Sequence, residues 1–510
     1  MIKKDNIRIV KNTIIVYVRL VVTAIIGLIT SRYVLQILGA SDFGLYSVIG
    51  GVIVMFTFIS GSLQATTVRF INYEMGKSDG NLNLVFNTSR QIHILFAVAI
   101  FILAEILGVY YILNYLNVDA AKIGDALFVF HVSMSVACLG IVNVPYQGLL
   151  IAHEKFSHVA CVDIFISVAK LVMVIGLFYS NGNLLRLYAL GMGGITFISF
   201  VVYLFFCWRY WPEVVAYKLS RSARRHKEML IFNNYTLLTT VSLIGRNQGS
   251  NLLINFFFGT IVNAAYAISN TVHTYVNTFA GCFDQASAPQ ITQSLSRGDN
   301  ERALFLVNNT CRICILLVEI VFFAMIADLD FILHLWLGDN VPDGTYTFCQ
   351  LTLLLAVVSA TSGGLAQYIN GLGRIKWFTI IMSLLYLIAF VISLLSYKMG
   401  APAESIILSF ILADVINRGF QLHLLRRMVN FPVSVFLKKA YLRPAVVFLV
   451  GMLVVWCYRQ MPIASTVSHL AGIAAVVVVM AVVVLFVGLS SEERNYMLLS
   501  IKHKQKNENY

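Results

Sequence analysis

Residues 470–489 read LAGIAAVVVVMAVVVLFVGL, a run of twenty apolar residues without a charge. A helix of about twenty such residues is long enough to cross the hydrocarbon core of a bilayer. Runs of similar length recur along the 510-residue chain, which is 59% hydrophobic and only 12% charged. A soluble domain carries about twice that share of charged residues, so a soluble fold is excluded. The sequence predicts an all-α polytopic membrane protein.

Polar breaks divide the apolar runs into fourteen predicted transmembrane helices. An even number of spans places both ends of the chain on the same side of the membrane. The predicted spans are 12–37, 43–70, 86–113, 123–151, 156–180, 184–209, 230–257, 261–296, 303–335, 345–371, 375–398, 402–427, 435–458 and 464–489.

The basic residues orient these spans. The side that holds both termini carries 27 of the 37 Lys and Arg, whereas the opposite loops carry only Lys122, Arg186, Lys398 and Arg459. Cytoplasmic loops of membrane proteins are enriched in Lys and Arg, so we expect both termini to be cytoplasmic. The net charge of +13 then reports topology and predicts no nucleic-acid partner. No loop exceeds about twenty residues, which leaves no room for a soluble catalytic domain.

An internal repeat accompanies this pattern. Shifting the chain by 220 residues pairs Gly39 with Gly259, and a polar stripe lies in the same register in both copies. The steps of 4, 7, 4 and 3 residues place each stripe on one helix face. We therefore predict two pseudo-symmetric six-helix lobes, residues 1–215 and 216–430, followed by two spans and a basic tail in 431–510. The stripes are Tyr46, Gly50, Thr57, Gly61 and Gln64, and Tyr266, Asn270, Asn277, Gly281 and Asp284.

Charged side chains inside the spans point to a pathway. An Arg or Lys at the centre of a bilayer costs about 2.5–3.5 kcal/mol, so such a residue faces protein, a partner charge or water. Arg19 and Arg246 share helix faces with Thr and Ser side chains. These faces predict a central cavity between the lobes, although the same polar groups could bond helix to helix. The predicted cavity residues are Arg19, Arg246, Tyr46, Gln64, Tyr266, Asn270, Asn277 and Asp284.

Other intramembrane charges have potential partners on their own helix. Three such pairs share a helix face, and they serve either as structural contacts within a lobe or as coupling groups. The pairs are Asp163 with Lys170, Arg312 with Glu319, and Asp414 with Arg418.

Enzyme and metal motifs are incomplete. Gly76-Lys77-Ser78 lacks the Gly that a phosphate-binding loop needs at position 71, which is Ile. His153 and His158 are five residues apart and face different sides of a helix, whereas a zinc-protease helix needs a separation of four. Cys311 and Cys314 lie in an apolar run without a second pair. We predict no catalytic residue, no metal and no cofactor.

Four sequence segments resemble a known family. Leu38-Gly-Ala-Ser-Asp-Phe-Gly-Leu-Tyr46, Arg69-Phe-Ile-Asn-Tyr-Glu-Met-Gly-Lys77, Val144-Pro-Tyr-Gln-Gly148 and Ala288-Pro-Gln290 are similar to bacterial polysaccharide repeat-unit (O-antigen) flippases of the Wzx type. These flippases belong to the multidrug, oligosaccharidyl-lipid and polysaccharide exporter (MOP) superfamily. The resemblance covers about residues 10–430.

The resemblance implies a function and partners. It implies a bacterial inner-membrane protein that moves an undecaprenyl-pyrophosphate-linked oligosaccharide to the periplasmic leaflet, for O-antigen lipopolysaccharide or capsule assembly. A polysaccharide polymerase and glycosyltransferases are the implied partners, beside the lipid bilayer. Arg19 and Arg246 match the family's cationic cavity by location. A lipid II flippase, an ion-coupled multidrug or metabolite antiporter that uses Asp284, and a non-transporting scaffold remain alternatives.

Overall fold

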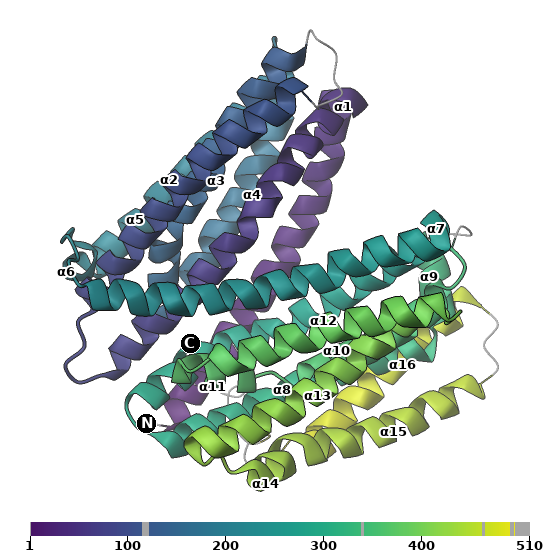
Figure 1. The fold of residues 1–510 in the computed structure, drawn as a ribbon. Helices are drawn as coiled ribbons and strands as arrows, with labels where there is room; N and C mark the ends of the chain where they lie inside the picture. Colours follow the sequence, from purple (N-terminus) through teal and green to yellow (C-terminus); the bar gives the residue numbers. More distant parts are fainter. Residues whose placement is uncertain (1, 115–121, 338–340, 462–464, 490–493, 495–510) are drawn as a thin grey trace, which may run out of the picture. The chain divides into compact units, whose positions relative to one another are not determined.

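The structure is a computed structural model that describes residues 2–114, 122–337, 341–461, 465–489 and 494 (Figure 1). Within these ranges the chain is almost entirely helical, as the sequence predicted. The first helices are α1 (Ile2–Gly76), α2 (Leu82–Asn114), α3 (Ile123–Ala152), α4 (Phe156–Leu177), α5 (Leu184–Tyr210), α6 (Pro212–Val215) and α7 (Ala223–Ser296). The later ones are α8 (Asn300–Ala327), α9 (Leu329–Leu337), α10 (Thr345–Ala360), α11 (Leu365–Leu372), α12 (Lys376–Lys398), α13 (Ser405–Val429), α14 (Val433–Phe436), α15 (Leu442–Arg459) and α16 (Thr466–Val483). Two π-helical turns, Leu437–Tyr441 and Val484–Gly488, adjoin α15 and α16.

The helices form two compact units. The N-terminal unit is Lys11–Thr240, and the C-terminal unit is Val241 onward together with residues 1–10. Two units agree with the expectation of two lobes. The division falls inside α7, so the boundaries expected at residues 215 and 430 remain predictions.

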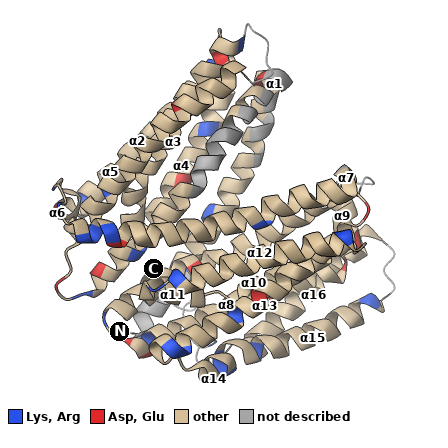
Figure 2. Ribbon diagram, viewed as in Figure 1, with Lys and Arg blue, Asp and Glu red and all other residues tan. Residues whose placement is uncertain are grey.

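Most of the predicted spans correspond to apolar helices. In the part of the chain that the structure describes, nine helices are long and apolar enough to cross a membrane, or ten when the bent pair α10 and α11 counts as one. Ten of the fourteen predicted spans coincide with these. The other four fall in α1 and α7, so the count of fourteen remains a prediction. Figure 2 shows that Lys, Arg, Asp and Glu occupy little of the helix length.

Three predicted boundaries differ from the structure. The break expected at residues 38–42 is absent, because α1 continues through it. This segment contains Gly and Ser, which weaken a helix, but no Pro, which would break one. The span expected at 303–335 is interrupted at Asp328, and the span expected at 345–371 bends by 46° between α10 and α11. The segments Asp328-Leu-Asp330 and Thr361-Ser-Gly-Gly364 mark these breaks in the sequence, but each is short and is flanked by long apolar runs, so span prediction from hydropathy passes over it.

The break expected after residue 257 is confirmed. Inside α7 the helical geometry fails at Gly259, where φ is 81° and ψ is −173°. A side chain strongly disfavours this backbone conformation, so the absence of a Cβ is what lets the chain turn here.

A buried carboxylate, Glu74, holds together several chain segments at one end of the N-terminal unit. Glu74, near the end of α1, accepts hydrogen bonds from Arg225 at 3.1 and 3.2 Å and from the Asn81 backbone N–H at 3.1 Å. Lys77 lies 3.4 Å from the same carboxylate. Glu74 thus joins α1, the loop after it and the start of α7.

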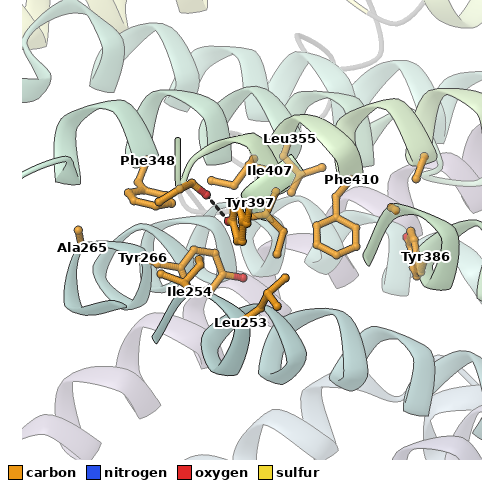
Figure 3. Packing of buried hydrophobic residues seen from close by; sticks show 14 residues of the cluster. Leu253, Ile254, Ala265, Tyr266, Phe348, Leu355, Tyr386, Tyr397, Ile407 and Phe410 are labelled. Atoms are coloured by element: carbon orange, nitrogen blue, oxygen red, sulfur yellow. Dashed lines mark hydrogen bonds between the residues drawn. The ribbon is translucent and has the colours of Figure 1, made fainter. Parts of the chain in front are cut away.

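Close helix contacts organise both units. In the N-terminal unit α3 packs against α2 and α5. In the C-terminal unit α8 packs against α10, α15 and α16, and it is the most buried of the candidate spans. Gly451 of α15 lies against the Phe323 ring of α8, where an added Cβ would meet ring carbons at 2.3–2.5 Å. A second apolar cluster joins α7, α10, α12 and α13 around Tyr266, Phe348 and Phe410 (Figure 3).

We predict that Gly451→Ala destabilises the C-terminal unit. The new methyl group would overlap the fully buried Phe323, and overpacking a core typically costs about 1–3 kcal/mol. The measurement is the thermal unfolding temperature in detergent, which should fall by several degrees. Gly194→Ala is the matched control, because nothing lies within 4 Å of its added Cβ. An unchanged unfolding temperature for Gly451→Ala would contradict this packing.

Candidate intramembrane binding site

Arg19, Asp163 and Tyr203 meet inside the N-terminal unit, and we call them the N-terminal triad. Arg19 on α1 donates from Nη1 to Oδ2 of Asp163 on α4 at 3.0 Å. The Tyr203 hydroxyl on α5 donates to the other oxygen, Oδ1, at 3.3 Å. Both oxygens of the carboxylate therefore have a donor, which is the condition for keeping an ion pair away from water.

The N-terminal triad belongs to a longer polar network. Gln147 on α3 interacts with the Tyr203 hydroxyl and accepts a 2.8 Å hydrogen bond from Gln64 of α1. Lys170, two turns after Asp163 on α4, interacts electrostatically with the Asp163 carboxylate. Lys170 lies about 10 Å from Asp163 along the helix axis, so only Arg19 pairs directly with the carboxylate, and this part of the network holds two basic side chains and one acidic side chain. Side chains of Arg19 and Asp163 remain 22% and 29% exposed, so the cluster is accessible.

Arg246, Asp414 and Tyr386 form a similar arrangement in the C-terminal unit, the C-terminal triad. The Tyr386 hydroxyl on α12 donates to Oδ1 of Asp414 on α13 at 2.7 Å. Nη1 of Arg246, on α7, lies 3.9 Å from Oδ2. Ser359 of α10 donates to the same Oδ2 at 3.1 Å. Arg246 therefore does have a carboxylate partner, on a helix far away in sequence, although none is nearby in its own helix.

Aromatic rings surround this second arginine. The Arg246 guanidinium lies 5.2 Å from the Tyr386 ring centre and 5.8 Å from that of Phe410. Both rings belong to the buried cluster of Figure 3. The side chains of Arg246 and Asp414 are only 10% and 6% exposed. The C-terminal triad is therefore drier than the N-terminal one.

Asp284 has a local role in the C-terminal unit. Its carboxylate accepts hydrogen bonds from the Gly364 backbone N–H at 2.7 Å and from Gln367 at 2.8 Å. Gly364 immediately precedes α11, so Asp284 caps the second half of the broken span. Both oxygens are used in this way.

The unwound residues between α10 and α11 hold further polar contacts. The Thr361 carbonyl accepts hydrogen bonds from Tyr441 at 2.9 Å and from the Cys311 thiol at 3.2 Å. Arg418 donates to the Thr361 hydroxyl at 3.2 Å and also bonds Gln421. The expected pairing of Arg418 with Asp414 is replaced by these contacts, because Asp414 bonds Tyr386 and Ser359.

The remaining predicted residues occupy different surroundings. Tyr46 packs edge to face with Tyr188, with ring centres 4.8 Å apart. Tyr266 is buried against Phe348, at 5.9 Å, and Asn277 bonds His273 at 2.9 Å. Asn270 is partly buried. Whether these residues and Gln64 line one shared cavity with Asp284 stays a prediction.

The charged pair expected on α8 takes other contacts. Arg312 donates to the Lys439 carbonyl at 2.9 Å and to Asn309 at 3.0 Å. Glu319 is buried, and its Oε2 has no hydrogen-bond partner among the described residues. A separation of seven residues, about 10 Å along the helix, explains why Arg312 turns to nearer acceptors.

Sequence reasoning missed several members of both triads. Tyr203, Tyr386, Gln147 and Ser359 lie in apolar runs, where Tyr and Ser are common and carry no distinctive spacing. The only feature of the sequence that could have identified them is that each places a polar group inside a predicted span, where it needs a hydrogen-bond partner. Which partner it finds depends on the packing of helices that are far apart in sequence.

Comparisons with solved structures address the fold. A multidrug resistance MATE family transporter of the MOP superfamily, in an outward-facing conformation, aligns with a TM-score of 0.66 over 89% of this chain and 97% of its own, at 12% identity. A MOP superfamily transporter from Pyrococcus furiosus aligns with a TM-score of 0.64 over 89% of this chain and 96% of its own, at 14% identity. A MATE transporter of Vibrio cholerae aligns with a TM-score of 0.65 over 84% and 99%, at 15% identity.

The chain has the MOP-superfamily transporter fold. No protein-family model and no curated protein sequence matches it. The structural likeness shows that the chain shares its fold with these solved transporters. With its apolar helices it makes the chain a multi-pass membrane protein.

We predict that the C-terminal triad is needed for stability. Asp414→Asn leaves the Arg246 guanidinium buried without a counter-charge, and breaking a buried pair in this way typically costs about 3–5 kcal/mol. The double variant Arg246→Met with Asp414→Asn removes both charges and should recover part of the loss. Thermal unfolding of the parent protein, the two single variants Asp414→Asn and Arg246→Met, and the double variant measures this coupling. Additive losses in the double variant would show that the two side chains do not interact.

Proposed function

We propose that the chain is a flippase that moves undecaprenyl-pyrophosphate-linked oligosaccharide repeat units from the cytoplasmic to the periplasmic leaflet by alternating access. The observation that supports this most is the accessible Arg19–Asp163 pair, with a second basic side chain, Lys170, two turns further along the helix of Asp163. A lipid-linked pyrophosphate carries the negative charge that such a cluster can accept. Flipping makes and breaks no covalent bond, so the proposal needs no catalytic residue.

Arginine chemistry suits a pyrophosphate. The guanidinium presents several N–H donors in a planar fork, and its charge-assisted bonds strengthen where water is excluded. Partly buried polar side chains, among them Gln64, Tyr46, Asn270 and Asn277, are candidates for contacts with the sugar hydroxyls. The surface polysaccharide that the cargo serves, O-antigen or capsule, is part of the proposal and rests on the sequence resemblance.

The direction of transport follows from the distribution of basic residues. Residues 218–227 and both termini are assigned to the cytoplasm on the asymmetry of Lys and Arg. Moving about two negative charges outward is favoured by an inside-negative potential, by about 2.3 kcal/mol per charge per 100 mV. The membrane potential can therefore contribute to the driving force.

An antiporter that uses Asp284 as its coupling group is the second candidate. Its support is the likeness to a multidrug resistance transporter. Against it stands the position of Asp284, whose two oxygens cap the break between α10 and α11. Both oxygens of Asp284 are therefore already engaged by groups of its own unit. We therefore favour the flippase.

The topology has a direct test. Single cysteines introduced at Arg221 and Arg224, in a background without native cysteines, should resist an impermeant thiol reagent in intact cells and react after the membrane is permeabilised. A cysteine at Asn183, in the opposite loop, is the control and should react in intact cells. Ready labelling of the 218–227 segment in intact cells would reverse the proposed direction.

The transport test uses proteoliposomes that contain a fluorescent undecaprenyl-pyrophosphate oligosaccharide. Arg19→Ala should slow flipping, because losing a charge-assisted contact costs about 1.5–3 kcal/mol, or about 10- to 150-fold in affinity. Arg19→Lys should recover only part, since it keeps the charge and loses the fork. Ethidium efflux driven by a proton gradient is measured in parallel. Ethidium transport without oligosaccharide flipping would favour the antiporter.

A further inference from the structure

The two triads repeat one chemical arrangement at matching places in the chain. In each, a carboxylate accepts a tyrosine hydroxyl on one oxygen and faces an arginine with the other. The arginine comes from the first predicted span of its lobe, and the other two residues come from the fifth and sixth. The positions are exchanged, because Asp163 precedes Tyr203 whereas Asp414 follows Tyr386. The repeat thus preserves the chemistry without preserving the residue at each position.

The surroundings of the two ion pairs differ. The Arg19–Asp163 pair is short, at 3.0 Å, and its side chains are 22% and 29% exposed. The Arg246–Asp414 pair is longer, at 3.9 Å, and its side chains are 10% and 6% exposed. A group from outside can approach the first pair, whereas helices and rings enclose the second.

The two carboxylates, Asp163 and Asp414, also differ in the further cations and hydrogen-bond donors around them. Asp163 has a second cation, Lys170, on its own helix. If Arg19 bonds another anion, Lys170 remains to balance Asp163. The cation nearest in sequence to Asp414 is Arg418, which is engaged by Thr361 and Gln421. In addition to the hydrogen bond from Tyr386, Asp414 accepts a second one from Ser359.

We propose that the two triads have different roles: the N-terminal triad is an exchangeable anion site, in which an anionic group of the cargo displaces Asp163 from Arg19, whereas the C-terminal triad is a permanent lock within its unit. The exchange rests on the proposed function, in that the cargo carries the phosphate. Asp163 keeps Arg19 charged and oriented while the site is empty. After exchange, the phosphate pairs with Arg19, while Asp163 keeps its hydrogen bond from Tyr203 and the longer-range attraction of Lys170.

The exchange predicts that Asp163 competes with the ligand. A ligand that must displace a resident group binds more weakly, in proportion to the fraction of time that the site is free. Neutralising Asp163 should therefore tighten anion binding. A substitution that loosens Asp163 without changing any charge should also tighten anion binding. A purely electrostatic effect of neutralising Asp163 would not produce that result.

The experiment measures equilibrium binding of radiolabelled farnesyl pyrophosphate to the purified full-length chain in lipid nanodiscs, with competition by farnesol as the neutral control. We expect Asp163→Asn to lower Kd about tenfold and Arg19→Gln to raise it at least about tenfold. Tyr203→Phe, which releases the carboxylate and keeps every charge, should lower Kd about threefold. The matched variant Tyr386→Phe, which keeps every charge of the C-terminal triad, should leave Kd within about twofold.

The outcomes separate the two proposals. If farnesyl pyrophosphate binds but neither Asp163→Asn nor Tyr203→Phe tightens binding, the exchange is wrong and the proposed function stands. Equal tightening by Tyr386→Phe would overturn the division of roles. If farnesol competes as well as unlabelled farnesyl pyrophosphate, the site does not recognise the anion, and both the exchange and the proposed cargo are wrong. Tyr203→Phe keeps the test decisive should Asp163→Asn fail to fold.

Discussion

A bilayer contains almost no water to solvate a charge, and this constraint explains most polar contacts in the structure. Each intramembrane carboxylate of the two triads has a donor on both oxygens: Tyr203 and Arg19 for Asp163, and Tyr386 and Ser359 for Asp414. Asp284 meets the same demand with a backbone N–H and a glutamine. The charged residues therefore determine which helices must pack together, because a helix that carried one of them alone would leave it unsatisfied.

The two units satisfy this constraint with different packing and different numbers of charged groups around the carboxylate. In the C-terminal unit the donors around Asp414 are closely packed and aromatic rings cover the guanidinium, so the charges contribute mainly to a fixed arrangement of α7, α12 and α13. In the N-terminal unit Lys170 leaves a surplus positive charge beside an accessible pair. A surplus charge inside a membrane protein is costly, and its retention is most easily understood if a ligand of opposite charge neutralises it.

Much of the fold could be predicted from the sequence, because the apolar runs, their separations and Gly259 are local signals. The breaks at Asp328 and at Thr361–Gly364 were not predicted, since their polar segments are short and the hydrogen bonds that stabilise them come from helices far away in sequence. For the site, the sequence identified Arg19, Arg246 and the intramembrane acids as residues needing partners. It paired Asp414 within its own helix and gave Arg246 none, because contacts between distant helices leave no trace in the spacing of a single sequence.

The broken span α10 and α11 has a consequence for the biogenesis of the protein. Its unwound backbone can enter lipid only when other groups bond it, and Asp284, Cys311, Arg418 and Tyr441 supply those bonds. The first two are synthesised before the break and the other two after it. When the break is synthesised, Asp284 and Cys311 are therefore already available to bond Gly364 and the Thr361 carbonyl. The bond from Arg418 to the Thr361 hydroxyl can form only after α13 has been synthesised. Full burial of this segment is thus a late step, completed only when the ribosome has passed residue 441.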